Sequence, residues 1–274
     1  AGILAGDMII KVGETDLKNM PINDAVKLMR GEPGTSVEVT ILRKKANKPI
    51  VLMIQREIII SKGIKTKLFK NNIGYIRLSN FQSNSTSDLQ TAFYKLNKES
   101  NNKLQGLIFD LRNNPGGVLG AAVGISDLFL QNGKIVETKG RSSNSELKYE
   151  ATARDISNGM SLVVLINEGS ASASEIVAGA LQDNKRATIL GTKSYGKASV
   201  QTIQELSDGS ALKLTTAKYY TPLGKDIHEN GIVPDIVVEL SEDDVVSLPE
   251  PYDKDKQLFE AIKILSENKV TAIN

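Results

Sequence analysis

Hydrophobic and polar positions follow different periods in two parts of the chain, and the change falls near residue 58. In the first part the segments are short, and Ser36–Arg43 alternates apolar with polar residues, as a half-buried strand does. Strands are also expected at Met8–Val12 and Pro49–Gln55, and apolar spacing predicts a short helix at Asn23–Arg30. Residues 1–57 therefore predict a small β-rich unit with one helix.

Residues 58–274 carry more strongly apolar segments that alternate between strand and helix patterns. Leu107–Leu111 and Leu162–Ile166 are unbroken apolar runs, which are typical of strands buried on both faces of a sheet. The further strands expected here are Ile73–Leu78, Ala187–Leu190, Leu212–Tyr219 and Ile232–Val238, and the expected helices are Ser87–Lys98, Val118–Leu130, Ala173–Asp183 and Lys256–Lys269. This β-α-β rhythm predicts an α/β core with a largely parallel sheet.

Composition narrows the function classes mainly by exclusion. With 40% hydrophobic and 24% charged residues the chain is of the soluble globular kind, and no apolar run approaches the ~20 residues of a membrane span. A net charge of +2 without a dense Lys/Arg block indicates no nucleic-acid partner. The absence of cysteine excludes thiol nucleophiles, and the one histidine, His228, leaves room for one histidine-based triad at most. Because the chain opens without Met or a signal sequence, we interpret it as a mature or truncated fragment.

Three serines follow the apolar run Leu162–Ile166, in the segment Gly169–Glu175. A helix N-terminus has free N–H groups and a partial positive charge, so a serine there can present its hydroxyl beside an N–H that binds an oxyanion. Ser172 and Glu175 also match a capping box, in which Ser172 only caps the helix. From this segment alone the cap is the commoner explanation.

A nucleophilic serine needs a base, and the chain offers His228 or a lysine. A lone histidine in a polar stretch is usually only solvated, whereas neutral lysine serves as the base in serine–lysine variants of the triad. Lys197 lies 25 residues after Ser172, with one expected helix and one expected strand between them. Such a unit returns the chain to the same edge of a sheet, so both side chains are expected near the carboxyl ends of neighbouring strands.

A competing pattern pairs Ser194-x-x-Lys197 with Ser142-x-Asn144, as in penicillin-binding enzymes. We reject it because the two motifs stand in the wrong order and Gly196 weakens the helix that the first one needs. The loop Asn113–Gly117 follows an apolar strand in the same way as the serine run. Its glycine N–H groups could complete an oxyanion hole, or the loop is a plain strand-to-helix turn.

Taken together, these segments resemble the C-terminal (tail-specific) processing peptidases, the serine–lysine endopeptidases of family S41. The resemblance rests on Gly2–Val12, Ile73–Phe81, Asp110–Gly117, Gly169–Ile176, Gly196–Gln201, and Gly224 with Gly231–Asp235, in the order that the family has. It implies a crotonase/ClpP-like protease core with a C-terminal helix at residues 58–274. It also implies that residues 1–57 are part of a PDZ domain, whose earlier strands and carboxylate-binding loop are not in this chain.

The resemblance assigns roles to particular residues. Ser172 would be the nucleophile, Lys197 the general base, and Gln201 the residue that orients the lysine amine. The oxyanion hole would be the N–H of Ala173 with that of Gly116 or Gly117, and no metal or cofactor is required.

The resemblance also implies partners and a location. The substrates would be proteins or peptides with flexible C-termini. The expected location is extracytoplasmic, in a periplasm, at a cell surface or secreted, with membrane tethering and homo-oligomer formation as further expectations.

Two other function classes stay open. The chain could be a non-catalytic PDZ-type scaffold that binds peptide tails, or an acyl-CoA enzyme of the crotonase type, because a shared fold does not fix function. The presence of both Ser172 and Lys197 favours the peptidase.

Overall fold

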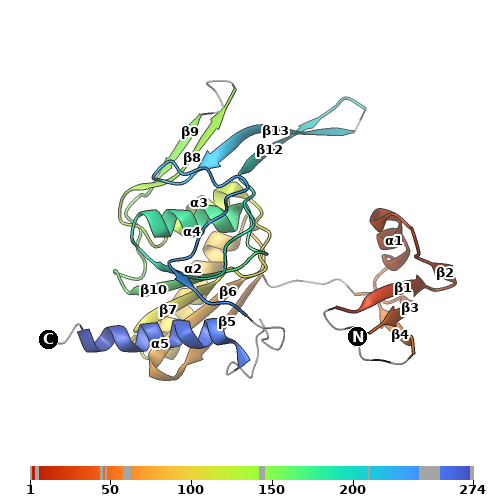
Figure 1. Ribbon diagram of the computed structural model, residues 1–274, viewed down its shortest axis with the longest axis horizontal. Coiled ribbons are helices and arrows are strands. Elements are labelled where there is room, and N and C mark those ends of the chain that lie inside the picture. The colour runs from red at the N-terminus through yellow and green to blue at the C-terminus, as the bar shows by residue number, and fades with distance from the viewer. Residues whose placement is uncertain are drawn as a thin grey trace. The chain divides into compact units, whose positions relative to one another are not determined.

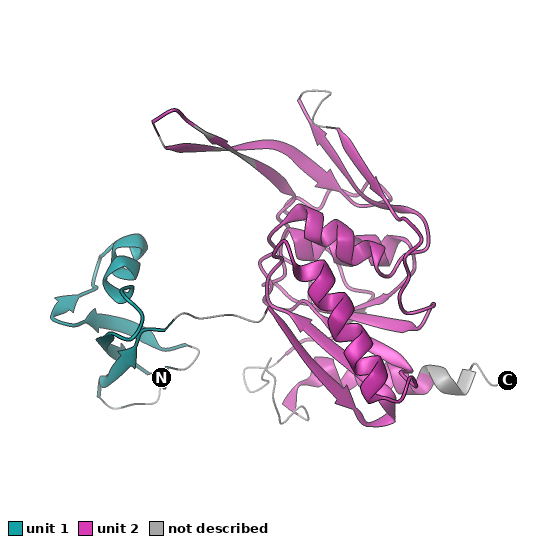
Figure 2. Ribbon diagram, turned by 180° about the vertical axis from the view of Figure 1, so that it is seen from behind, with its two compact units in different colours: residues 1–61 teal, residues 62–274 magenta. Residues whose placement is uncertain are grey.

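The computed structural model describes residues 2–3, 6–43, 46, 48–57, 63–141, 146–208, 210–240 and 254–271. The chain forms two compact units, residues 1–61 and residues 62–274 (Figures 1 and 2). No helix among the described residues combines the length and the apolar character that crossing a membrane requires.

The first unit is a four-stranded antiparallel sheet with one helix. The strand order is β2-β1-β3-β4, with β1 Met8–Val12, β2 Thr15–Asp16, β3 Ser36–Leu42 and β4 Ile50–Gln55, and the helix is α1 Ile22–Met29. The alternation predicted for β3 is confirmed, since Val39 and Ile41 are buried while Glu38 and Leu42 are exposed and Thr40 is half-buried. That this unit is part of a PDZ domain stays a prediction.

A six-stranded sheet forms the centre of the second unit. Its order is β14-β11-β10-β7-β6-β5, with β5 Ile64–Phe69, β6 Ile73–Leu78, β7 Gly106–Asp110, β10 Ser161–Ile166, β11 Thr188–Gly191 and β14 Ile236–Val237. The neighbouring pairs from β6 to β14 are parallel, and only β5 runs antiparallel to its neighbour β6. The predicted α/β core with a largely parallel sheet is therefore confirmed.

Helices cover both faces of this sheet (Figure 1). The helices α2 Ser85–Glu99, α3 Leu119–Asp127 and α4 Ala173–Asp183 share one apolar core with strand residues such as Phe109 and Val164. On the other face, α5 Lys256–Thr271 packs Leu258 and Leu265 against residues such as Ile108 and Val163. Burial on both faces explains why β7 and β10 are unbroken apolar runs.

A second, antiparallel sheet stands beside the first helix layer. Its order is β12-β13-β8-β9, with β8 Lys134–Gly140, β9 Leu147–Glu150, β12 Ser199–Glu205 and β13 Ala211–Tyr220. Only β13 was predicted. A bulge in β8 interrupts the alternation of its side chains, and in β12 the apolar residues Val200 and Ile203 stand three positions apart, so neither strand shows a period of two in the sequence.

Two predicted elements are shorter in the structure. The strand predicted at Ile232–Val238 is only β14, because Ile232 pairs with Ser194 instead and Pro234 has no N–H to give a ladder. The helix predicted to reach Leu130 ends at Asp127, after which the chain continues in turns with bonds between residues three apart.

Candidate active site

Ser172 stands at the junction between β10 and α4, where it is the N-cap residue of the helix. Its backbone has φ = 57°, in the left-handed region that a side chain other than glycine rarely adopts. Such a conformation costs on the order of 1–3 kcal/mol and is kept where the surrounding structure enforces it, which is common at functional sites. The turn thus holds Ser172 in a strained position at the carboxyl end of a central parallel strand.

The three serines of the run have different surroundings. Ser170 is fully buried and donates its hydroxyl to the carbonyl of Leu111 at 2.8 Å, and the fully buried Ser174 donates to the carbonyl of Asn114 at 2.9 Å. Ser172 is half-buried, lines a cleft, and has its Oγ 2.8 Å from the hydroxyl of Tyr219. Of the three, Ser172 alone lines the cleft.

The cleft has a volume of about 700 Å³ and draws its walls from segments far apart in the sequence. Its lining residues are Asn80, Phe81, Pro115, Gly116, Gly117, Val118, Leu119, Ser172, Lys197, Ser199, Val200, Gln201 and Tyr219. Five of the six residues assigned a role from the sequence are in this set, and Ala173 adjoins Ser172. The return of the chain to the same sheet edge, predicted from the αβ unit between Ser172 and Lys197, is what brings them together.

The fully buried carboxylate of Glu175 joins the serine segment to the lysine segment. Its Oε2 accepts the N–H of Ser172 at 2.8 Å and the N–H of Lys197 at 2.9 Å. Its Oε1 accepts the N–H of Gly196 and the hydroxyl of Ser194, each at 2.6 Å. The bond from the Ser172 amide to Glu175 is the one expected of a capping box, but the carboxylate also fixes a segment about 20 residues further on.

The rejected Ser194-x-x-Lys197 pattern has a structural explanation. The Ser194 hydroxyl is buried, donates to Glu175, and accepts the N–H of Ile232 at 2.6 Å, so it braces the loop. It does not line the cleft. Ser142 and Asn144 lie outside the described residues.

The N–H groups at the cleft differ in their availability. Gly116 donates its N–H to the side-chain oxygen of Asn114 at 2.9 Å. Within the described part of the chain, the N–H groups of Ala173 and Gly117 have no hydrogen-bond acceptor. Of the three N–H groups assigned from the sequence, those of Ala173 and Gly117 are therefore open to an oxyanion among the described residues.

Both glycines of the loop are required by close backbone approach. A Cβ on Gly116 would lie 2.8 Å from the Cβ of Ser172, and one on Gly117 would lie 2.0 Å from the carbonyl oxygen of Phe81. Both residues have positive φ, 101° and 145°. These contacts keep the loop against the serine turn.

Lys197 and Gln201 line the cleft, but the hydrogen bonds expected of the Lys197 amine are not seen among the described residues. Lys197 is half-buried and Gln201 is exposed. Among the described residues, no hydrogen bond links the Lys197 amine to Ser172 or to Gln201. The serine–lysine pairing and the orienting role of Gln201 therefore stay predictions.

His228 does not line the cleft, and its Nε2 lies 4.0 Å from the exposed carboxylate of Glu229. Tyr219 was missed from the sequence, since an aromatic residue in a strand usually only fills the core. Burial raises the pKa of Tyr219, the hydrogen bond to Ser172 lowers it, and the Glu175 carboxylate raises it further, so that the net shift is upward.

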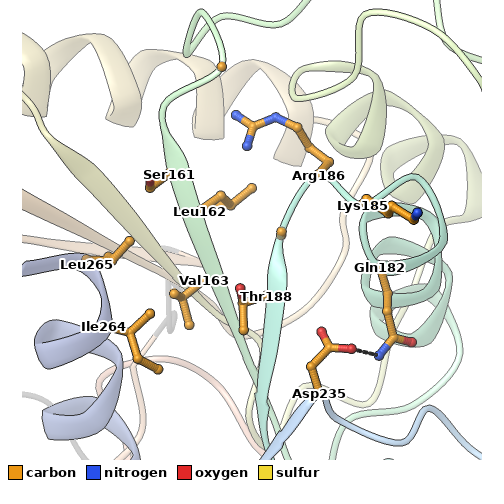
Figure 3. Close-up of a pocket in the computed structure, with 12 residues that line it drawn as sticks. Ser161, Leu162, Val163, Gln182, Lys185, Arg186, Thr188, Asp235, Ile264 and Leu265 are labelled. Carbon is orange, nitrogen blue, oxygen red and sulfur yellow. Dashed lines mark hydrogen bonds between the residues drawn. The ribbon is translucent and has the colours of Figure 1, made fainter. Parts of the chain in front are cut away.

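A different cleft, of about 440 Å³, opens at the amino ends of β10 and β11, at the opposite edge of the sheet (Figure 3). There Gln182 of α4 donates to Asp235 at 2.8 Å, and Asp235 also accepts the N–H of Ile189. None of the residues assigned a role from the sequence lines it. Asp235, the last residue of a family-like motif, therefore ties β11 to α4 and has no place at the Ser172 cleft.

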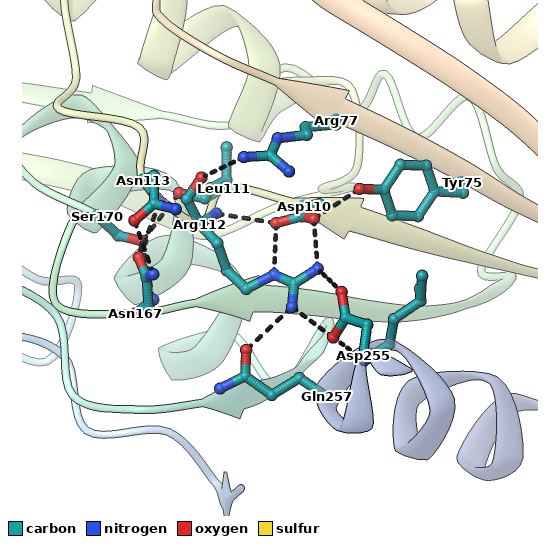
Figure 4. Close-up of polar contacts among 11 residues, drawn as sticks. Tyr75, Arg77, Asp110, Leu111, Arg112, Asn113, Asn167, Ser170, Asp255 and Gln257 are labelled. Carbon is teal, nitrogen blue, oxygen red and sulfur yellow. Dashed lines mark hydrogen bonds and ion pairs between the residues drawn. The ribbon is translucent and has the colours of Figure 1, made fainter. Parts of the chain in front are cut away.

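A buried ionic network stands directly before the glycine loop (Figure 4). Arg112 is 1% exposed and donates to both carboxylate oxygens of Asp110, at 3.0 and 2.7 Å, and to both of Asp255, at 2.8 Å. It also donates to the side-chain oxygen of Gln257 at 3.0 Å, and Tyr75 donates to Asp110 at 2.6 Å. The network joins the carboxyl end of β7 to the start of α5.

Charge pairing decides the protonation states in this network. Burial by itself would raise the pKa of Asp110, but the charge and hydrogen bonds of Arg112, together with Arg77 and Tyr75, hold that pKa below its ordinary value. Burial, followed by the Asp110 charge, raises the pKa of Tyr75, which therefore stays a phenol and a donor. These fixed charges brace the loop that begins at Asn113.

Comparison with known proteins gives consistent matches. A model of Peptidase family S41 matches residues 72–238. The carboxy-terminal-processing protease of Bartonella bacilliformis is 48% identical over 253 residues, 92% of this chain and 57% of that protein. The carboxyl-terminal-processing protease of Synechocystis sp. is 40% identical over 243 residues, 87% of this chain and 56% of that protein. The chain thus spans less than two-thirds of the length of these curated relatives.

Comparison with solved structures also finds C-terminal processing and S41 proteases. The photosystem II D1 C-terminal processing protease matches with a TM-score of 0.65 and 35% identity, over 87% of this chain and 64% of that one. A putative S41 protease from Bacteroides fragilis shares the fold, with a TM-score of 0.64 and 18% identity over 97% of this chain and 74% of that one.

Proposed function

The chain belongs to peptidase family S41, and on this premise we propose that it is a serine endopeptidase that cleaves protein substrates near their C-termini. The observation that carries the proposal is the setting of Ser172. Ser172 lines a cleft that Lys197 and Gly117 also line, and Ala173 is the next residue after Ser172; among the described residues, the N–H groups of Ala173 and Gly117 have no acceptor.

The proposed chemistry is acyl transfer to Ser172. Its Oγ attacks the scissile carbonyl carbon while the neutral amine of Lys197 accepts the hydroxyl proton. The carbonyl oxygen becomes an oxyanion that accepts the N–H groups of Ala173 and Gly117. Protonated Lys197 then gives its proton to the leaving amine, and the acyl-enzyme forms. Water deprotonated by Lys197 hydrolyses the ester and restores Ser172, while Gln201 orients the lysine amine.

The proposed substrates are proteins and peptides with flexible C-termini. The names of the relatives from Bartonella bacilliformis and Synechocystis support this choice, since both are carboxy-terminal-processing proteases. Within the same proposal, residues 1–57 are part of a PDZ domain that assists in selecting the tail, and the protein works outside the cytoplasm, with a membrane tether or a homo-oligomeric state as further hypotheses.

Exchange of single serines tests the proposal. Ser172→Ala should reduce peptide cleavage to background, a loss on the order of 10⁶-fold in kcat for a serine nucleophile. Ser174→Ala is the matched control, because it removes a hydroxyl two residues away that bonds only the Asn114 carbonyl. Its kcat should stay within about tenfold of the parent chain, since losing one buried hydrogen bond costs about 1 kcal/mol.

The measurement is cleavage of a peptide with an unstructured, apolar C-terminus, followed by mass spectrometry of the products. Circular dichroism confirms that each variant is folded. A folded Ser172→Ala chain that still cleaves the peptide would refute the proposed nucleophile.

A further inference from the structure

Tyr219 of β13 places its hydroxyl between the proposed nucleophile and the strand that follows the proposed base. The residue is 4% exposed and lines the cleft. Its hydroxyl oxygen lies 2.8 Å from the Oγ of Ser172 and 3.0 Å from the carbonyl oxygen of Ser199. Its own N–H donates to the carbonyl of Ala198 at 3.0 Å. Backbone and side chain together thus fix Tyr219 against residues 198–199.

The directions of these hydrogen bonds follow from counting protons. A phenol has one proton, and the carbonyl oxygen of Ser199 can only accept, so the Tyr219 hydroxyl donates to Ser199. The bond between Tyr219 and Ser172 must then be donated by the Ser172 hydroxyl. A raised pKa keeps Tyr219 in the phenol form at neutral pH, which preserves this order.

A serine hydroxyl that donates to a phenol is not activated. The oxygen of a neutral phenol is a far weaker base than an amine, so it cannot remove the serine proton. The proton of Ser172 is directed at Tyr219, and no hydrogen bond joins Ser172 to the Lys197 amine among the described residues. For attack, the Ser172 hydroxyl has to turn from Tyr219 towards Lys197.

We propose that Tyr219 is a positioning residue that holds the Ser172 hydroxyl in a resting orientation, and that release of this hydrogen bond precedes acylation. The inference rests on the proposed function, because it takes Ser172 as the nucleophile. It adds a residue outside the serine, the lysine and the oxyanion hole. Tyr219 acts only through Ser172, and its removal favours the reactive orientation.

Tyr219→Phe tests this directly, because it removes the hydroxyl and keeps the ring. The probe is a fluorophosphonate, which reacts with an activated serine, and the rate of labelling is followed by mass spectrometry. We expect the second-order labelling rate and kcat to rise about fivefold, the scale of one lost neutral hydrogen bond, with KM unchanged within about twofold. A merely structural role would instead lower kcat and the labelling rate.

Tyr220→Phe is the matched control. Tyr220 is the next residue of the same strand, and its ring lies under the Lys139 amine at 5.1 Å. Losing this hydroxyl should leave the labelling rate of Ser172 unchanged. Unchanged or slower labelling in a folded Tyr219→Phe chain would overturn the proposal.

Two further arms keep the experiment decisive. If Tyr219→Phe does not fold, 3-fluorotyrosine is placed at position 219, which keeps the hydroxyl but makes it a weaker hydrogen-bond acceptor. Labelling of Ser172 should then still accelerate. No acceleration would refute the resting hydrogen bond. Ser172→Ala should abolish labelling. Labelling that persists in Ser172→Ala refutes the proposed function itself, whereas labelling confined to Ser172 with no effect of Tyr219 refutes only this inference.

Discussion

At the scale of single residues, the same side-chain type takes different tasks within a few positions. Ser170 and Ser174 donate their hydroxyls to the carbonyls of Leu111 and Asn114, and the second of these bonds ties α4 to the glycine loop. Ser172 has φ = 57° and is the only one of the three that lines the cleft. The choice of the middle serine came from the family resemblance, and the burial of its two neighbours gives that choice a physical reason.

Lys197 carries the next prediction at this scale. Both Lys197→Ala and Lys197→Arg should lower kcat by about 10²–10⁴-fold, the usual contribution of a general base. Arginine keeps the positive charge but cannot give up its proton in a protein, so it should not rescue activity. Peptide cleavage under saturating substrate measures the effect, with circular dichroism to confirm folding.

Lys193→Arg is the control for this pair of variants. Lys193 lies four residues earlier, is exposed, and does not line the Ser172 cleft. Its replacement should leave kcat unchanged. His228→Ala should also retain activity, because His228 is outside the cleft, and a folded but inactive His228→Ala chain would overturn lysine as the base.

At the scale of elements, the sequence predicts best where one rule decides the outcome. The bounds of β6 and α4 match the prediction, because β6 is a short, mostly apolar segment between polar residues and α4 begins after the N-cap Ser172. The strand β8 was missed because a bulge breaks its alternation, and β12 because its apolar residues Val200 and Ile203 are three positions apart. For the cleft, the sequence predicted only that the site residues lie near the carboxyl ends of neighbouring strands, and it gave no role to Tyr219.

Long-range polar contacts are the part of the structure that no local sequence pattern predicts. Glu175 fits a capping box in the sequence, yet it also binds Ser194, Gly196 and Lys197 across the fold. Asp255 bonds Arg112 across 143 positions. Partners this far apart in the sequence are chosen by tertiary structure, and one sequence offers no signal for them.

The link between α5 and the glycine loop yields a prediction at this scale. Asp255→Asn leaves the buried Arg112 with one carboxylate in place of two, and it also weakens the bond that caps α5 at Leu258. Removing one partner of a buried ion pair costs 3–5 kcal/mol, so a loss of about 3 kcal/mol in the free energy of unfolding is expected with Asp110 still present. Urea unfolding of the second unit measures it.

Glu260→Gln is the control on the same helix. Glu260 pairs with Lys263 at 3.4 Å near the surface, where such a pair is worth at most about 1 kcal/mol. If the Asp255→Asn chain has the same free energy of unfolding as the Glu260→Gln chain, the structural role given to the network is contradicted.

The same network fixes the sign of a pH effect. The folded-state pKa of Asp110 lies below its unfolded value of about 3.9. Its contribution to stability is therefore complete above about pH 4 and disappears as the pH falls through the lower folded value.

At the scale of the whole molecule, the two units have separate cores. Both apolar clusters of the second unit consist of residues from Ile64 onward, and every residue assigned to the proposed site lies within it. Among its described residues, the first unit buries a much smaller set of apolar residues, namely Val12, Ala25, Val39 and Ile41. The second unit thus contains what its own folding and the proposed acylation of Ser172 require.

Residues 63–274 alone should therefore fold and react with the fluorophosphonate at Ser172 at the rate of the whole chain, within about twofold. The physical reason is that acylation by a small probe needs the serine, the base and the oxyanion donors, and no selection of a substrate tail. The measurement is the labelling rate of both chains under the same conditions, with Ser172→Ala in each as the control. The folding control is the unfolding midpoint of residues 63–274, which should equal that of the second unit in the whole chain. If residues 63–274 pass this control and yet react tenfold more slowly, residues 1–61 support the catalytic geometry itself. A role of residues 1–61 limited to tail selection would then be refuted.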